Sequence, residues 1–219
     1  MRKGKMFFNT IIIISMIALI SVIAYVSYYY ISKYLDFKEA EQAVAEFENK
    51  VIVVEIQDEE QNEIQVNETI QTPVPETPTT NKTSSKTYYK GYTMIGTIQI
   101  PKTKVKAPIV DKVTVNSIAA AAAVLYGPGL NEKGNTVIVA HNYRNGTFFS
   151  NNKKLVVGDK IYITDSTGKK VEYTIYKTYI TGEMDFSYAT RETAGKREIS
   201  LSTCTTDASK RLVIWARES

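Results

Sequence analysis

With 219 residues, the chain is long enough for one ordinary domain plus additional segments. Its 43% hydrophobic and 23% charged residues exclude a wholly disordered chain and a fibrous one. The single cysteine excludes an intramolecular disulfide and every multi-cysteine zinc motif, and the single histidine excludes an HExxH motif. The formal net charge of +4 is an average over three different segments. Residues 1–35 carry four basic residues and no acid, and residues 36–80 carry twelve acids and two lysines. Residues 81–219 carry eleven acidic and 21 basic residues.

Residues 6–32 contain no charged side chain. About 20 helical residues cross the roughly 30 Å core of a bilayer, so this stretch is long enough to span it. A cleavable signal peptide is the alternative, but its apolar region is normally about 7–15 residues long. We therefore predict that residues 1–35 form a cytoplasmic tip and an uncleaved membrane anchor. Arg2, Lys3 and Lys5 would hold the N-terminus inside, with the rest of the chain outside the cell.

Residues 36–86 are predicted to form an acidic stalk and a linker. Apolar residues recur at helical spacing from Phe37 to Val51, which indicates a stalk helix over 36–52, either solvated or packed on a partner. From residue 57 the periodicity is lost, and proline, threonine, glutamine and glutamate dominate. Residues 57–86 are therefore interpreted as an extended linker.

From about Tyr88 the chain shows short β-type runs, predicted as strands over 97–100, 105–110, 135–141, 161–164, 170–180, 198–204 and 211–217. The run Val115–Leu125 is the one predicted helix, with Thr114 or Asn116 as its N-cap. Residues 165–168 are predicted as a hairpin turn. Short strands with one helix predict that residues 87–219 form a mostly β domain, a largely antiparallel and closed or nearly closed β-barrel.

The single cysteine and the single histidine both end predicted strands. Cys204 lies on the strand face opposite Ile199 and Leu201. Free cysteines are often small core hydrophobes, but an unpaired thiol outside the cell is open to oxidation, which favours a working role. A thiol is mostly protonated at neutral pH, so a cysteine nucleophile gains from a nearby base. His141, the only imidazole, is either that base or a structural histidine.

Arg211 opens the last predicted strand after a six-residue loop, 205–210. If the two flanking strands are antiparallel neighbours, Cys204 and Arg211 lie at the same end of the sheet. A guanidinium there is able to donate two hydrogen bonds to a carbonyl that becomes an oxyanion during acyl transfer. The alternative is a solvated charge at a strand end.

Together these residues resemble the sortases, the membrane-anchored cysteine transpeptidases of Gram-positive bacteria. Ser200-Leu201-Ser202-Thr203-Cys204 is similar to the family's TLxTC signature, Val139-Ala140-His141-Asn142 to its strand-end histidine, and Gly96-Thr97-Ile98-Gln99-Ile100-Pro101 to its first strand. The resemblance covers residues 88–217. It implies an eight-stranded β-barrel with His141 as general acid/base, Cys204 as nucleophile and Arg211 as oxyanion or substrate stabiliser.

The sequence departs from the family's pattern at two places in these motifs: Ser200 stands for the usual threonine and Ala140 for the usual glycine. No Asp-Pro-aromatic lid motif precedes the barrel, which argues against a pilin-polymerising class. In some sortases carboxylates in the loop corresponding to 181–196 bind calcium. The three acids there, Glu183, Asp185 and Glu192, are interpreted as solvated, and we expect no cofactor and no metal.

The resemblance implies cleavage of a C-terminal LPxTG-like sorting motif of secreted proteins through a Cys204 thioester. The acyl group would pass to an amine of a cell-wall precursor or a pilin. Membrane contact is expected through residues 6–32, and nucleic-acid binding is not expected because the basic residues are scattered. Two alternatives stay open: another cell-wall cysteine acyl-transferase similar to an L,D-transpeptidase, or a non-enzymatic membrane-anchored binding module.

Overall fold

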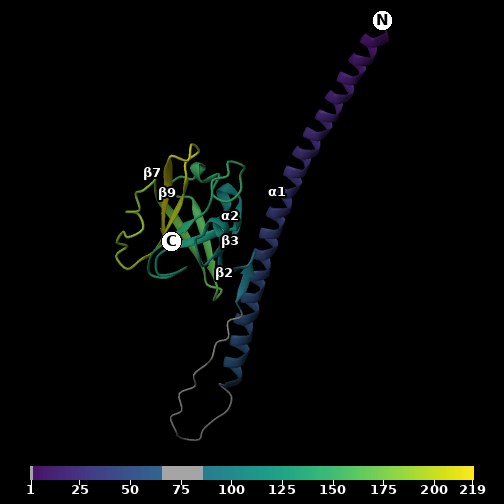
Figure 1. Ribbon diagram of the computed structural model, residues 1–219. Coiled ribbons are helices and arrows are strands. Elements are labelled where there is room, and N and C mark those ends of the chain that lie inside the picture. Colours follow the sequence, from purple (N-terminus) through teal and green to yellow (C-terminus); the bar gives the residue numbers. More distant parts are fainter. Residues whose placement is uncertain (1, 66–85) are drawn as a thin grey trace, which may run out of the picture. The chain divides into compact units, whose positions relative to one another are not determined.

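The computed structural model (Figure 1) describes the backbone of residues 2–65 and 86–219, with the side chains of residues 9, 11–50 and 86–219. It divides into two compact units, Met1–Glu39 and Ala40–Ser219, which are taken separately below. Most of the predicted linker falls in 66–85, outside the described residues. The domain boundaries expected at residues 35 and 86 stay predictions.

Helix α1 (Arg2–Gln65) is longer than the sequence indicates, because residues 57–65 continue the helix where a linker was predicted. Residues 57–65 are rich in glutamate and glutamine, which favour an α-helix even where no apolar stripe is present. The segment Ile11–Lys50 has a mean hydropathy of 2.5 in its most apolar window, none of it buried. By length and composition alone it is able to cross a membrane, a criterion that a signal sequence also meets. An apolar N-terminal helix fits the predicted membrane anchor.

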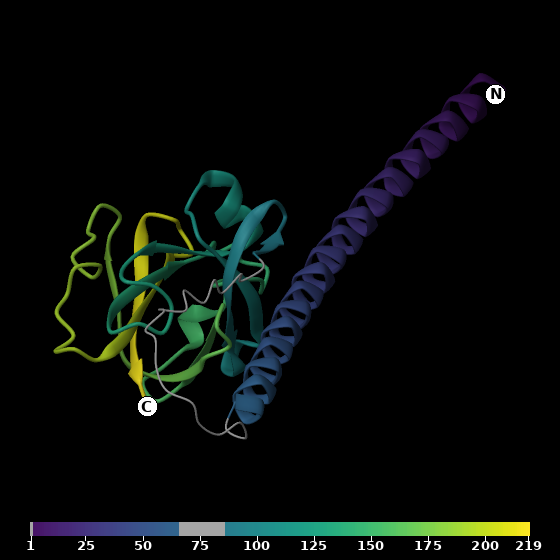
Figure 2. The same ribbon diagram turned by 90° about the horizontal axis from the view of Figure 1, so that it is seen from below.

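The second unit is a closed eight-stranded β-barrel, as predicted (Figure 2). The strands are β1 (Thr87–Tyr89), β2 (Tyr92–Ile100), β3 (Val105–Val110), β4 (Ala122–Tyr126), β5 (Gly134–Val139), β6 (Lys160–Asp165), β7 (Lys170–Gly182), β8 (Arg197–Cys204) and β9 (Lys210–Glu218). The sheet order is β1-β2-β3-β4-β5-β8-β9-β7-β6, and β2 also pairs with β6, which closes the barrel and leaves β1 as a hairpin strand beside β2. Two short 3₁₀ helices, η1 (Pro101–Thr103) and η2 (Asn152–Lys154), lie in connections.

Two strand pairs are parallel, β3 with β4 and β5 with β8, while the other described pairs are antiparallel. The β5–β8 ladder runs from Gly134 opposite Arg197 to Val139 opposite Ser202. Because the strands run in the same direction, both C-terminal ends meet at one edge of the barrel. This pair therefore brings together two segments that are distant in sequence.

The predicted helix Val115–Leu125 is wrong over its second half. Helix α2 (Val115–Ala120) ends early, and β4 begins at Ala122. Alanine favours a helix, but β4 pairs with β3 on one side and β5 on the other, and this tertiary pairing outweighs a weak local preference. The predicted cap is confirmed: the Thr114 hydroxyl accepts a hydrogen bond from the Ser117 amide at 3.0 Å, and Ser117 Oγ accepts one from the Thr114 amide at 2.8 Å.

Alternation along the strands separates the barrel interior from its outer face. On β8, Ile199 and Leu201 belong to the buried core, while Ser200 and Ser202 lie on the other face, as the sequence predicts. These two serines are nevertheless only 0% and 3% exposed. Something therefore covers the outer face of the barrel beside Cys204, and the loop between β7 and β8 does so, as described below.

The stalk part of α1 that belongs to the second unit packs on the barrel. Val44 and Phe47 are buried in a cluster with residues of β1–β4 and the turn before β4: Tyr89, Met94, Val110, Ala121 and Ala123. Glu48 accepts a hydrogen bond from Lys106 Nζ at 3.1 Å and one from Thr97 Oγ1 at 3.3 Å. The partner of the predicted stalk helix is therefore the chain's own barrel.

Candidate active site

Cys204 and Arg211 face each other across the β8–β9 ladder as one register pair. Both project from the outer face of the barrel, and Arg211 Nη1 lies 3.1 Å from Cys204 Sγ. Both side chains are partly exposed at the edge where the strands end. The antiparallel pairing of β8 and β9 thus places Cys204 and Arg211 at the same end of the sheet, as predicted.

The short loop that joins these residues is tied to itself. The Thr205 amide donates to the Lys210 carbonyl at 2.9 Å, which continues the ladder past Cys204. Asp207 accepts hydrogen bonds from Thr205 Oγ1 at 2.5 Å and from Ser209 Oγ at 2.8 Å. These bonds lower the pKa of Asp207 to about 2. The loop thereby keeps β8 and β9 in register up to the edge that carries Cys204 and Arg211.

His141 follows β5 by two residues and lies level with Cys204 across the parallel β5–β8 pair. Thr203 Oγ1 donates to the Ala140 carbonyl at 2.8 Å. Asn142 Nδ2 donates to the Cys204 carbonyl at 3.0 Å. These two bonds hold the strand ends together on either side of His141, so the predicted base and the predicted nucleophile share one edge.

The imidazole of His141 packs against aromatic rings of its own loop. Its centroid lies 4.9 Å from that of Tyr143, which in turn lies 5.9 Å from that of Phe148. Partial burial lowers the pKa of His141 below its ordinary value of 6.5, because desolvation disfavours the charged ring. The imidazole is therefore neutral at physiological pH and available to accept a proton.

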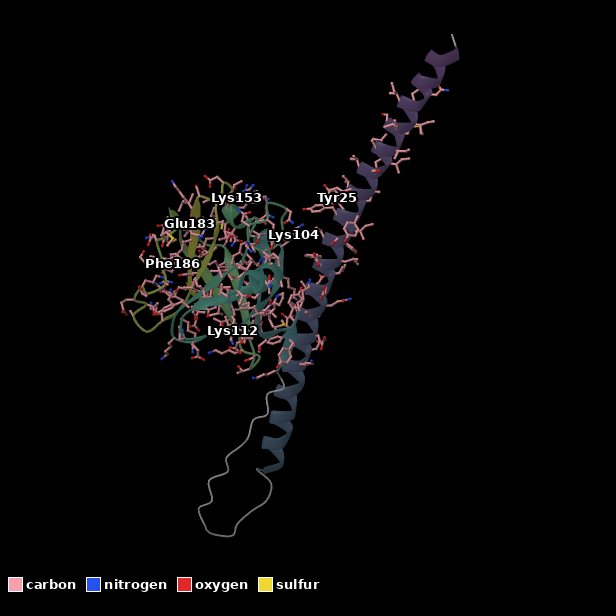
Figure 3. All side chains as sticks on the ribbon, viewed as in Figure 1. Tyr25, Lys104, Lys112, Lys153, Glu183 and Phe186 are labelled. Atoms are coloured by element: carbon pink, nitrogen blue, oxygen red, sulfur yellow. The ribbon has the colours of Figure 1, made fainter. Side chains whose placement is uncertain are left out.

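The loop between β7 and β8, residues 183–196, contributes a carboxylate to this edge. Arg211 Nη2 donates to Glu183 Oε1 at 3.2 Å, so the guanidinium bridges Cys204 and Glu183. Figure 3 shows Glu183 and Phe186 on the same side of the barrel, in this loop. The contact gives Glu183 a partner that the sequence, which suggested a solvated acid, did not indicate.

Neither of the other two loop acids lies in a metal site. Asp185 accepts hydrogen bonds from Thr181 Oγ1 and from the Ser187 amide, the latter at 3.0 Å, and these bonds lower its pKa. Among the residues that the structure describes, no group of three His, Cys, Asp or Glu is arranged to hold a metal ion. The expected absence of a cofactor stays a prediction.

Sequence reasoning missed Asn142 and Tyr143 as parts of this edge. Asn142 stands in the quoted histidine motif, but its bond to the Cys204 carbonyl depends on the parallel pairing of β5 and β8. Tyr143 was placed only in a polar loop, and its contact with His141 arises from the local turn. A thiol, a neutral imidazole and a guanidinium at one edge are the groups that acyl transfer to sulfur requires.

Comparison with known proteins agrees with this geometry. Residues 98–219 match the family model of the sortase domain. Over 124 residues the chain is 32% identical to sortase A of Bacillus anthracis, a match that covers 55% of this chain and 58% of that protein.

Solved structures extend the likeness to the fold. Sortase A from Corynebacterium diphtheriae superposes with a TM-score of 0.53 at 26% identity, covering 58% of this chain and 61% of that one. Sortase C-1 from Actinomyces oris gives 0.52 at 22% identity over 57% of this chain and 72% of that one, which supports the fold alone. The matched region spans less than two thirds of both sortase A relatives.

Proposed function

The chain belongs to the sortase family, and from this premise we propose that it is a cysteine transpeptidase acting on sorting motifs of secreted proteins. The observation that carries the proposal is the 3.1 Å contact of Arg211 Nη1 with Cys204 Sγ at the edge that His141 shares. In this proposal Cys204 is the nucleophile, His141 the general acid/base and Arg211 the oxyanion stabiliser.

The first half-reaction forms a thioester. Neutral His141 takes the proton of the Cys204 thiol, and the resulting thiolate attacks the carbonyl carbon of the scissile peptide in an LPxTG-like motif. The negative charge that develops on the oxygen is met by Arg211 and by backbone N–H groups. The carbon–nitrogen bond then breaks as His141 donates a proton to the departing amine. The acyl group stays on sulfur, so the energy of the peptide bond is conserved and no nucleotide is needed.

The second half-reaction transfers the acyl group. An amine from a cell-wall precursor or a pilin attacks the thioester carbonyl, and His141 accepts the proton that this amine loses. The carbon–sulfur bond breaks, and the released Cys204 thiolate takes this proton back from His141, which restores the starting state. A neutral His141 suits this step, because only the neutral ring accepts a proton.

The proposed location follows from charge and hydropathy. The apolar part of α1 would hold the chain in the membrane, with Arg2, Lys3 and Lys5 inside and the barrel outside. Residues 81–219 carry ten more basic than acidic residues, which favours residence near anionic wall polymers and lipid headgroups.

The test uses the full chain in detergent with a quenched LPxTG-type peptide and an amine acceptor. We expect cleavage, a covalent acyl-enzyme on Cys204 detectable by mass spectrometry, and a transpeptidation product. Cys204→Ala should abolish all three, whereas Thr206→Ala, an exposed change in the same loop, should leave them intact.

Each other outcome favours a different function. Reaction with peptidoglycan stem peptides but with no sorting peptide would indicate the L,D-transpeptidase-like enzyme. Binding of sorting peptides without any acyl-enzyme would indicate a binding module. Cleavage that persists in Cys204→Ala would remove the proposed nucleophile.

A further inference from the structure

The C-terminal half of the β7–β8 loop is fastened to the outer face of the barrel. Asn135 at the start of β5 donates through Nδ2 to the carbonyls of Tyr188 at 2.9 Å and Ala189 at 3.0 Å. The Tyr188 ring is 1% exposed, and its hydroxyl lies 3.2 Å from Ser202 Oγ. This segment therefore covers the strand that leads to Cys204.

A buried ion pair completes the attachment. Arg191 Nη1, in the same loop, donates to the Glu198 carboxylate on β8, and Arg191 Nη2 donates to Asn135 Oδ1 at 2.9 Å. The side chains of Arg191 and Glu198 are only 9% and 1% exposed. One guanidinium thus links the loop to both strands of the parallel pair.

Glu198 is the centre of this network. It also accepts hydrogen bonds from Tyr176 Oη and from Arg217 Nε, each at 2.6 Å. Burial raises the pKa of Glu198, but the bonds from Tyr176, Arg191 and Arg217 outweigh that effect and lower it overall. The carboxylate is therefore ionised at neutral pH and balances part of the charge of two arginines.

Aromatic packing fixes the orientation of Arg191. Its guanidinium carbon lies 4.6 Å from the ring centre of Trp215, and Lys177 Nζ lies 4.4 Å from the same ring. Trp215 projects from the outer face of β9, next to the strand that carries Glu198. Lysine at position 191 would keep the positive charge but lose the planar fork that reaches Glu198 and Asn135 together.

We propose that Arg191, Glu198 and Asn135 are positioning residues that hold Tyr188–Arg191 against β5 and β8 as a preformed wall of the substrate groove. The inference rests on the proposed function. Tyr188 contacts Ser202, two residues before Cys204 and about 7 Å from it along the strand. Glu183, which contacts Arg211, directly follows β7 and lies outside the attached segment, so that contact does not depend on the attachment.

A preformed wall lowers the cost of binding, because the substrate does not have to order the loop itself. Loss of the attachment should therefore raise KM and leave kcat nearly unchanged, since Cys204, His141 and Arg211 lie on the strand ends. A residue with a purely structural role would instead lower thermal stability without a selective effect on KM.

The experiment compares Arg191→Lys and Glu198→Gln with the control Glu218→Gln. Glu218 on β9 forms an ion pair with Arg197 on β8, at 3.0 Å, but does not contact the loop. In the full chain without substrate, hydrogen exchange is measured at the Ala189 amide, which donates to the Phe186 carbonyl at 2.9 Å. Peptide cleavage is then measured on the same preparations.

We expect Arg191→Lys to speed exchange at Ala189 about ten-fold and to raise KM about ten-fold, with kcat within about two-fold of wild type. Glu198→Gln should do the same or more, and Glu218→Gln should do neither. If Glu198→Gln does not fold, the milder Arg191→Lys decides the question by the same two measurements.

The inference is overturned if both variants fold and exchange at Ala189 is unchanged, or if kcat falls while KM stays constant. Because exchange is measured without substrate, this outcome is separate from a failure of the proposed function. If the wild-type chain cleaves no sorting peptide, the proposed function fails. The exchange comparison would still test whether Arg191 and Glu198 hold the loop on the barrel.

Discussion

Arg211 points one nitrogen at Cys204 Sγ, 3.1 Å away, and the other at Glu183 Oε1, 3.2 Å away. The guanidinium plane is therefore held from two sides before any substrate binds. In the proposed reaction, a donor that is already oriented toward the sulfur needs little reorganisation to meet an oxyanion that forms beside it. This relationship makes the shape of Arg211, and not its charge alone, the property to test.

Arg211→Lys should lower kcat/KM about 10²–10³-fold, because a lysine ammonium keeps the charge but does not reproduce the planar fork. The measurement is cleavage of a quenched sorting peptide by the full chain. Lys210→Ala, which removes an exposed neighbouring charge, should stay close to wild type. A lysine variant with full activity would show that the fork is not used.

The single histidine permits a direct titration. Burial lowers the pKa of His141, so the Hε1 resonance in a proton NMR titration should have its midpoint below 6.5. The unfolded chain would bind this proton first as pH falls below 6.5, so His141 should reduce stability in that window. His141→Gln should therefore lose less stability than wild type between about pH 7 and pH 5. A midpoint above 6.5 would contradict the desolvated setting.

Calcium should have no effect on activity. Glu183 is paired with Arg211, Asp185 is hydrogen-bonded within its own turn, and no metal-binding group exists among the described residues. Cleavage rates with excess EDTA and with millimolar calcium should agree within error. A rate that rises with calcium and falls again with chelator would show that the loop acids rearrange to bind it.

Phe47→Ala should lower the free energy of unfolding by about 3 kcal/mol, because it removes a ring that is 3% exposed between α1 and the barrel. Phe37→Ala is the matched control, since Phe37 lies on the same helix but is 44% exposed. Denaturant unfolding in detergent measures both. Equal small losses would mean that the stalk helix contributes nothing to barrel stability.

Gly96→Ala should destabilise the closure of the barrel. A Cβ at this position would meet the Leu130 side chain and would lie 2.5 Å from the Thr164 carbonyl oxygen, at the β2–β6 pair that closes the sheet. Since the backbone of β6 moves only by giving up this pairing, a loss of about 1–3 kcal/mol is expected. Gly182→Ala, with no atom within 4 Å of its added Cβ, should be nearly neutral in thermal unfolding.

Seven of the nine strands, all but β1 and β4, were predictable because each is a short run of β-type residues in the sequence. The edge that holds Cys204 and Arg211 was predictable for a similar reason, since a short loop between neighbouring strands leaves few arrangements. The helix expected up to Leu125 failed because alanine-rich segments carry little local information, and pairing with β3 and β5 decided their conformation.

The network around Glu198 was not predictable from the sequence. Arg191, Asn135 and Trp215 come from a loop and two other strands, and each taken alone reads as an ordinary surface or strand residue. Their meeting depends on β5 lying parallel to β8, a long-range pairing that no local pattern encodes. The docking of the stalk helix was not predictable either, because it depends on which apolar residues of β1–β4 the barrel itself leaves uncovered.

The parallel ladder of β5 and β8 also restricts how the edge that holds His141 and Cys204 changes in evolution. A slip by one residue turns every side chain of a strand to the opposite face, so strands exchange registers only in steps of two residues, about 6.6 Å. Cys204 ends β8, and His141 follows β5 by two residues. Any change of register between these strands therefore loses the alignment of the two side chains completely, and no gradual shift exists. Under the proposed function, gradual adaptation to a new peptide would occur in the connections around the edge, where single substitutions and changes in length leave the ladder untouched.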